Sequence, residues 1–413
     1  MDTKNIKRPE LLAPAGDMER LESALMYGAD AVYLGGEKYN MRAAPENFSD
    51  ENLKKAVEMC HKKGVKVHYI SNTLPRNDEL PHMPEFFEKA KDAGVDALIV
   101  ADLGVMKMAQ KYAPGIDIHI STQAGTVNYA TANALYDLGA KRVILAREVS
   151  LREIAEIREK TPKDLEIECF VHGAMCMSFS GRCLLSNYFT ERDANRGDCA
   201  QPCRWQYHLV EQKRPGQYFP ISNDENGTYI MNSQDMCMIE HIPELVAAGV
   251  DSFKIEGRAK SAYYAAVATN AYRAAIDGYL KNPSPDYKPE QWIIDEVRKI
   301  SYRDYCTGFY FGAPQENAHI YYDGIYIREW DIIANVDGSD GEFLTVTQRN
   351  RFFEGDELEV LMPSQKPFTI KVEEMYNEKG ERIEVAPNPM AKIKIRCTES
   401  IPAGAVLRKE RDD

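Results

Sequence analysis

Four cysteines gather within a short stretch near the middle of the chain. They are Cys176, Cys183, Cys199 and Cys203, which gives the spacing Cys-x6-Cys-x15-Cys-x3-Cys. Four thiolates this close in sequence can surround one soft metal centre, such as zinc, copper(I) or an iron–sulfur cluster. Structural zinc sites usually use CxxC pairs, and none occurs in this set. The spacing therefore favours an iron–sulfur cluster, with zinc as the alternative.

The fourth ligand of such a site stays open at this point. Cys237 follows the segment YIMNSQDM and could fold back to replace Cys203 as a ligand. Cys169 falls within an apolar strand-like segment, which predicts a core position. The other cysteines lie far from the cluster in sequence and are interpreted as ordinary residues.

A second group of chemically capable residues lies in the segment FKIEGR. Lys254, Glu256 and Arg258 alternate with Phe253 and Ile255, so a strand would place the three charges on one face. An arginine there could bind a carboxylate through two hydrogen bonds. We therefore expect a catalytic or binding site for an anionic substrate. A structural ion pair is the alternative for Glu256.

Further polar residues follow other apolar segments. We count His119 and Gln123 among the candidate catalytic residues, because they lie where a predicted strand ends. Asn40, Asn72 and Arg147 occupy similar positions after other strands. Together these residues predict a polar mouth at one end of the fold.

The cysteine-rich stretch is also basic and aromatic. Tyr188 and Phe189 interleave with candidate RNA-binding residues. These candidates are Arg182, Arg192, Arg196, Arg204 and Trp205. Arginines can hold phosphates while aromatic rings stack on unpaired bases. A solvated insertion that only holds the cluster is the alternative interpretation.

Short apolar segments alternate with amphipathic helical segments over most of the chain. Eight of them predict strands, centred on Leu11, Val32, Val67, Leu98, Ile118, Val143, Ile167 and Phe253. This alternation indicates βα units on a parallel sheet. Eight units in succession favour an α/β fold of the closed (β/α)8 TIM-barrel type. An open doubly wound sheet is the alternative, and both place active residues at the carboxyl ends of the strands.

The pattern predicts two domains. Residues 1–329 would form the (β/α)-barrel domain, interrupted by a cysteine-rich insertion over 173–228. Residues 330–413 contain period-two segments such as DELEVLMP and AKIKIRC, separated by turn residues. They predict a small C-terminal β-barrel domain.

The bulk composition restricts the class of protein. The chain has 413 residues and a net charge of −13, so nucleic-acid binding would need a local basic patch. No segment reaches the roughly 18 consecutive apolar residues of a membrane helix, and the first residues lack the apolar core of a secretion signal. We expect a cytoplasmic protein without membrane contact. Its clustered cysteines would then serve metal binding or catalysis and not disulfide formation.

Several long motifs resemble the peptidase U32 family, historically called collagenase-like. They are ELLAPAG from Glu10, ECFVHGAMC from Glu168, GRCLLS from Gly181 and FKIEGR from Phe253. The resemblance runs from about residue 8 to the end, and it is strongest to the branch that hydroxylates tRNA. It implies formation of 5-hydroxyuridine at the wobble position, position 34, of tRNA, with prephenate as an implicated metabolite. The implied partner is the tRNA anticodon loop, and a homologous partner subunit stays open.

The resemblance also implies a [4Fe–4S] cluster, whose four-cysteine spacing is met by Cys176, Cys183, Cys199 and Cys203. Two alternatives stay open. One is a U32-type peptidase, although the sequence has neither an HExxH helix nor a GxSxG elbow. A Cys–His pair of His172 and Cys176 would be the remaining route to proteolysis. The other alternative is a non-catalytic iron–sulfur scaffold.

Overall fold

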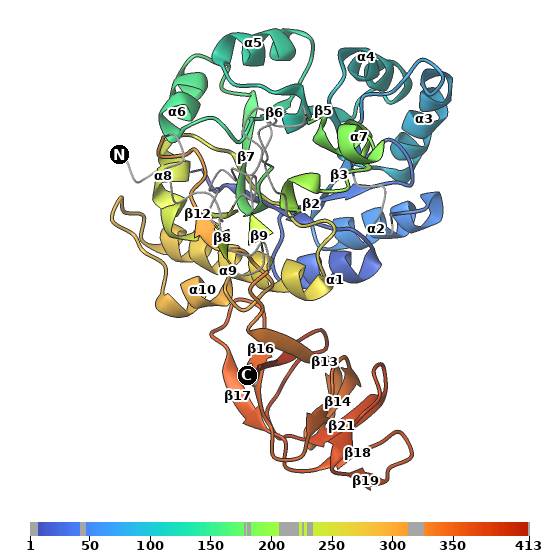
Figure 1. Ribbon diagram of the computed structural model, residues 1–413, viewed down its shortest axis with the longest axis vertical. Coiled ribbons are helices and arrows are strands. Elements are labelled where there is room, and N and C mark those ends of the chain that lie inside the picture. The colour runs from blue at the N-terminus through green and yellow to red at the C-terminus, as the bar shows by residue number, and fades with distance from the viewer. Residues whose placement is uncertain are drawn as a thin grey trace, which may run out of the picture.

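The computed structural model describes residues 7–41, 47–176, 179, 183–205, 223–224, 227–228, 234–312 and 326–411. Two bodies follow one another along this part of the chain, a helix-surrounded barrel and a smaller sheet domain (Figure 1). Across the described residues, no helix is both long enough and apolar enough to cross a membrane.

The first body is a closed barrel of parallel strands. Its strands are β1 (Glu10–Pro14), β2 (Ala31–Gly35), β3 (Lys66–Ser71), β4 (Ala97–Val100), β5 (Asp117–Ile120), β6 (Arg142–Ile144), β7 (Glu166–Ala174) and β11 (Ser252–Ile255). Each strand pairs with the next in parallel, and β11 closes the ring by pairing with both β7 and β1. The eight predicted strands and the closed barrel are confirmed, and the open sheet is excluded.

Helices surround the barrel, as Figure 1 shows. They are α1 (Met18–Met26), α2 (Asp50–Lys62), α3 (Met83–Ala93), α4 (Leu103–Tyr112), α5 (Tyr129–Asp137), α6 (Leu151–Glu159), α8 (Ile242–Ala247), α9 (Ala262–Lys281) and α10 (Gln291–Glu296). Several begin at a side chain that accepts a hydrogen bond from the first turn. Ser150 and Glu153 form a full capping box on α6, which satisfies amide groups that the helix itself cannot.

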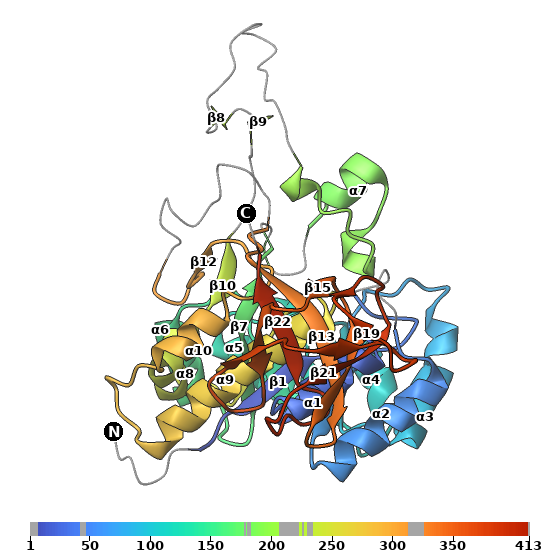
Figure 2. The same ribbon diagram turned by 90° about the horizontal axis from the view of Figure 1, so that it is seen from below.

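The chain leaves the barrel after β7 and returns through β10 (Asp235–Cys237), which pairs antiparallel with the end of β7. The predicted start of the insertion at residue 173 falls inside β7, because Gly173 and Ala174 still pair with β10. Within the excursion, α7 (Leu185–Thr190) is joined by two single turns, Ala194–Arg196 and Pro202–Arg204. Figure 2 shows α7 standing above one end of the barrel, on the side of α3 and α4.

The second body is an antiparallel sheet domain, as predicted. Its main sheet contains β13 (Trp330–Ser339), β14 (Phe343–Gln348), β16 (Glu357–Leu361), β17 (Phe368–Lys371), β18 (Met375–Tyr376), β19 (Arg382–Ile383), β21 (Lys392–Arg396) and β22 (Val406–Glu410). In β21 the exposed Lys392, Lys394 and Arg396 alternate with the buried Ile393 and Ile395. This period of two gives the domain a hydrophobic core of its own.

A buried charge cluster joins the two bodies. Arg408 on β22 is fully buried and pairs with Glu296 of α10 and with Glu359 of β16. Lys299 contacts the same two carboxylates, at 3.4 Å from Glu296 and 2.8 Å from Glu359. Because a buried carboxylate must be neutralised by a nearby charge, the cluster fixes the sheet domain against the barrel.

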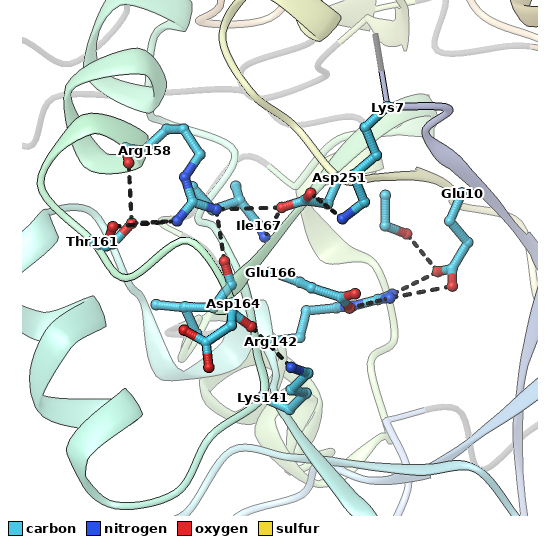
Figure 3. Close-up of polar contacts among 12 residues, drawn as sticks. Lys7, Glu10, Lys141, Arg142, Arg158, Thr161, Asp164, Glu166, Ile167 and Asp251 are labelled. Carbon is cyan, nitrogen blue, oxygen red and sulfur yellow. Dashed lines mark hydrogen bonds and ion pairs between the residues drawn. The ribbon is translucent and has the colours of Figure 1, made fainter. Parts of the chain in front are cut away.

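The interior of the barrel is also charged. Arg142 of β6 reaches Glu10 of β1 at 2.6 Å, Glu166 at 2.6 Å and Glu168 of β7 at 2.9 Å. Figure 3 shows its guanidinium group between Glu10 and Glu166. Lys254 of β11 binds the other oxygen of Glu168 at 2.7 Å. Burial raises the pKa of Glu168, but the charges of Lys254 and Arg142 outweigh this and lower it overall.

Three histidines are buried in the barrel domain. His68 and His119 lie edge to face with ring centroids 4.7 Å apart. His172, at the end of β7, is packed among the rings of Tyr264, Tyr272 and Tyr305. Burial lowers the pKa of His68 and of His172 from 6.5 to about 4 and lowers that of His119 well below 6.5. All three histidines are therefore neutral at pH 7.

Replacing Arg408 by leucine should destabilise the protein. Lys299, at 3.4 Å, would then be left to balance the buried Glu296, so we expect a loss of about 3 kcal/mol in unfolding free energy. The exposed pair Arg382–Glu354 provides the control, because solvent screens its charges and Arg382→Leu should cost much less than Arg408→Leu. Urea titration of both variants measures the difference. Equal losses would contradict the structural role of the cluster.

The buried histidines predict stability that depends on pH. A histidine whose folded pKa is depressed binds protons more weakly in the folded state, so stability falls as the pH drops from 6.5 to 4. For His172 the shift corresponds to roughly 3 kcal/mol over this window. Because neither ring nitrogen has a hydrogen-bond partner, His172→Phe should keep the fold. It should also reduce the stability that is lost as the pH falls. Denaturation at pH 7 and at pH 5 tests this, and an unchanged pH dependence would refute it.

Candidate functional site

A cavity of about 540 Å³ lies at the carboxyl ends of the barrel strands. Its floor includes Tyr33, Ile70, Ile99 and Phe170, which project from four different strands. Its other walls come from the excursion after β7 and from the segment that follows β11. Barrels of this type place their chemistry at this end, so the cavity is the candidate site.

The excursion supplies cysteines to this cavity. Cys176, Cys183, Cys199 and Cys203 all line it. The loop that carries them is held by local hydrogen bonds, such as those from Asn195 Nδ2 to the carbonyl of Cys183 at 3.0 Å and from the Gln201 amide to Cys199 Sγ at 3.4 Å. Four thiols facing one cavity are a donor set that fits a soft metal centre or an iron–sulfur cluster.

The alternative ligand, Cys237, lies elsewhere. It belongs to β10, its sulfur is 3.9 Å from the hydroxyl of Tyr272, and it is not among the described residues that line the cavity. Burial raises the pKa of its thiol to about 11. A buried, protonated thiol is a poor metal ligand. The geometry therefore favours Cys203 over Cys237.

The segment after β11 brings Lys254, Glu256 and Arg258 to the same cavity. The strand ends at Ile255, three residues before Arg258, so Glu256 and Arg258 lie beyond it and the predicted strand alternation over all three charges is wrong. Gly257 then takes φ 154°, and a Cβ there would lie 2.4 Å from the ring of Tyr264. This tight turn positions the charged side chains on either side of it.

Each of the three charged residues has a defined neighbour. Lys254 Nζ lies 4.5 Å above the ring of Tyr33, besides its contact with Glu168. Glu256 forms an ion pair with Arg147 at 3.1 Å. The alternative interpretation of Glu256, as one half of a structural ion pair, therefore has a partner in Arg147. Arg258 is buried and donates from Nη2 to Oδ1 of Asn40.

Room for Arg258 comes from a glycine on the neighbouring strand. A Cβ at Gly35 would lie 2.1 Å from Nη1 of Arg258. Any larger residue at position 35 would displace the guanidinium group. The close approach of β2 thus determines where this arginine sits in the cavity wall.

The cavity lining carries more cations than acids although the chain is acidic overall. Its lining contains the cations Arg147, Arg192, Lys254, Arg258 and Lys260. Glu256 is the one acidic side chain among the described lining residues. A recess lined by cations attracts anions even on a negatively charged protein. The predicted binding site for an anionic group therefore has a physical basis.

The two other candidate catalytic residues, Gln123 and His119, lie in different places in the structure. Gln123, in a single turn after β5, lines the cavity. His119 does not line it, because side chains of β5 alternate and His119 points into the barrel one layer below Ser121. Its expected place at the mouth is therefore wrong.

His119 belongs instead to a buried trio with His68 and Glu168, whose ligand atoms lie within 4.8 Å of one another. Both oxygens of Glu168 already contact cations, namely Arg142 and Lys254. Those two charges would repel a further metal ion. The trio is therefore better explained as a structural element of the barrel core.

The candidate RNA-binding residues are less uniform than the sequence indicates. Arg192 lines the cavity but pairs with Asp198 at 2.7 Å, and Arg196 pairs with Glu79 at 2.9 Å. Trp205 is exposed, as are Tyr188 and Phe189. Arg182 lies outside the described residues, as does the side chain of Arg204.

Sequence reasoning missed the residues that support the cavity from below. Glu10 and Arg142 are the first residues of β1 and β6, and Glu166 and Glu168 alternate with apolar residues in β7. Charges in such apolar segments predict ion pairs inside a barrel, so the sequence did contain a signal for these residues. The contact of Arg147 with Glu256 joins residues more than a hundred positions apart, so no local pattern could show it.

Comparisons with known proteins agree with this architecture. The pattern of peptidase family U32 matches residues 16–320, and that of the peptidase family U32 C-terminal domain matches residues 328–408. The chain is 37% identical to tRNA hydroxylation protein P1 of Bacillus subtilis, over 98% of this chain and 95% of that protein.

Two further relatives have different names. The chain is 36% identical to tRNA hydroxylation protein P of Escherichia coli, over 92% of both chains. It is 32% identical to a collagenase of Porphyromonas gingivalis, over 96% of this chain and 98% of that one. With both family patterns matched in order along nearly all of its length, the chain belongs to peptidase family U32.

Proposed function

We propose that this protein acts in tRNA hydroxylation, forming 5-hydroxyuridine at the wobble position with the help of an iron–sulfur cluster. The single observation that carries the proposal is the cavity itself. It combines four cysteines and Arg192 from the excursion with four cations from the barrel and its loops. Relatives that share nearly the whole chain are named tRNA hydroxylation proteins.

Cys176, Cys183, Cys199 and Cys203 would hold the cluster, which the donor set suits better than zinc. A bound [4Fe–4S] cluster would supply one-electron chemistry to the cavity. The chain's own residues would bind and orient the substrate beside it. The amide of Gln201, which donates to Cys199, adds a favourable contact to a thiolate.

The remaining cavity wall would bind the substrate. An anticodon loop presents its wobble base unpaired, so the base could enter the cavity without opening a helix. The exposed Tyr188, Phe189 and Trp205 offer stacking surfaces near the entrance. Lys254 and Arg258 would bind an anionic group, for which a small dicarboxylate such as prephenate is our candidate co-substrate. A protein that modifies tRNA in this way would work in the cytoplasm.

Proteolysis has weaker support. A Cys–His nucleophile would need His172 to accept a proton from Cys176. In the structure both ring nitrogens of His172 are buried and without a hydrogen-bond partner. Its pKa of about 4 also makes it a poor base. This geometry favours RNA modification over peptidase activity for the present chain, despite the collagenase-named relative.

The cluster is tested by serine substitutions. Protein purified without oxygen should be brown and contain acid-labile sulfide. Cys203→Ser should remove most of the visible absorbance and iron, because Cys203 lines the cavity, whereas Cys237→Ser should retain them. Iron and sulfide analysis with absorption spectra measures both. Stoichiometric zinc without sulfide would overturn the cluster, and the reverse order of the two variants would make Cys237 the ligand.

The substrate site is tested at Arg258. Mass spectrometry of tRNA nucleosides should show no 5-hydroxyuridine in a strain that lacks this protein and any paralogue. In this strain, the Arg258→Lys variant should restore about tenfold less 5-hydroxyuridine than the wild-type protein does. The reason is that lysine cannot form the two parallel hydrogen bonds that arginine makes to a carboxylate. The matched control is Arg273→Lys, a buried arginine of α9 outside the cavity lining.

Two outcomes distinguish a failure of the proposed function from a failure of the assignment of Arg258. Unchanged hydroxyuridine in the deletion strain would refute the function. Normal hydroxyuridine with both Arg258→Lys and Arg258→Ala would leave the function intact and remove Arg258 from the site. Iron content of each variant shows whether the cluster was preserved.

A further inference from the structure

A second cavity, of about 570 Å³, lies beside the first one on the side of α4 and α5. Its walls include Leu74, Leu103 and Leu184, which leave 42%, 56% and 67% of their surface exposed. Exposed leucines gathered around one recess are unusual on a protein surface and mark a place that receives a ligand or partner.

The two cavities are adjacent and share two lining residues. Gln123 from the barrel mouth and Asn195 from the excursion line both of them. The adjacent residues Leu184 and Leu185 face opposite sides, with Leu184 in the second cavity and Leu185 in the first. Gln123 and Asn195 therefore form a shared ridge, and a ligand with two groups could place one on each side.

The chemistry of the two cavities differs. The first contains five cations, whereas no lysine or arginine is found among the described residues that line the second. Its one acidic residue, Asp102, accepts the Val105 amide at 3.0 Å and caps α4. The second cavity therefore suits an uncharged, flat and largely apolar group, and it disfavours phosphate or carboxylate.

We propose that the second cavity binds the nucleobase next to the wobble uridine while the uridine occupies the first. This inference rests on the proposed function and adds a second subsite to it. Proteins that recognise single-stranded RNA hold neighbouring bases splayed apart in separate recesses. A nucleobase has apolar faces that pack on leucine side chains, and its amide edges can meet the side chains of the ridge. A contact with another protein would use the same leucines, and the experiment below distinguishes it.

The experiment combines changes in the protein and in the RNA. A hairpin RNA containing the anticodon stem and loop is titrated against the wild type, Leu103→Ser and Leu184→Ser. The titration is repeated with RNAs that lack the base on one or the other side of the wobble uridine. Leu138→Ser is the matched control, because this exposed leucine ends α5 and lines neither cavity.

We expect Leu103→Ser and Leu184→Ser to bind the intact loop about three- to tenfold more weakly, from the lost apolar contact. Both should bind as the wild type does once the relevant neighbouring base has been removed, because the partner of the leucine is then absent. Leu138→Ser should match the wild type with every RNA. All three positions are exposed, so the fold should be preserved.

The contrary outcomes are distinct. If the wild type binds the loop but the serine variants lose the same affinity for all RNAs, or none, the second subsite is wrong and the proposed function stands. If the wild type does not bind the loop, both are wrong. If the variants change self-association in sedimentation while RNA binding is unaffected, the cavity is a protein contact and the subsite is overturned.

Discussion

The fully buried carboxylate of Glu168 is the constraint on which the architecture of the site depends. A charge in the interior of a barrel is costly unless it is paired, and Arg142 and Lys254 provide the pairing from two other strands. Arg142 extends the network to Glu10 on the far strand β1. The network thereby ties together four strands and fixes Lys254 at the floor of the cavity.

Above this network, two parts of the chain supply the residues of the site. The barrel strands and their loops contribute four of the five cations, whose positions are set by strand ends and by the close approach at Gly35. The excursion contributes the cysteines, because a metal-binding loop need not follow the strand spacing. A site built from both sources can place a redox-active group beside a substrate that the rigid barrel holds.

The sheet domain contributes to the same region through its attachment. Arg408 pairs with Glu296 and Glu359 at the joint. The connecting segment pairs at Ile327 with Tyr302 of the barrel domain, with N–O distances of 2.7 and 3.2 Å. Tyr326, immediately before this bridge, lines the cavity. The position of the sheet domain and the wall of the cavity are therefore mechanically linked.

Elements whose signals are local could be predicted from the order of the amino acids alone. Apolar segments around Leu11, Val32 and Phe253 predicted barrel strands, because alternation between strand and helix is encoded in neighbouring residues. The spacing of the cysteines predicted a shared site in the same way. Which side chains contact one another depends on the folded arrangement of the whole chain. It placed His119 below the mouth, paired Glu256 with Arg147 and set the second cavity beside the first. Such contacts join residues far apart in sequence, and their geometry depends on barrel closure and on side-chain direction, which no local pattern specifies.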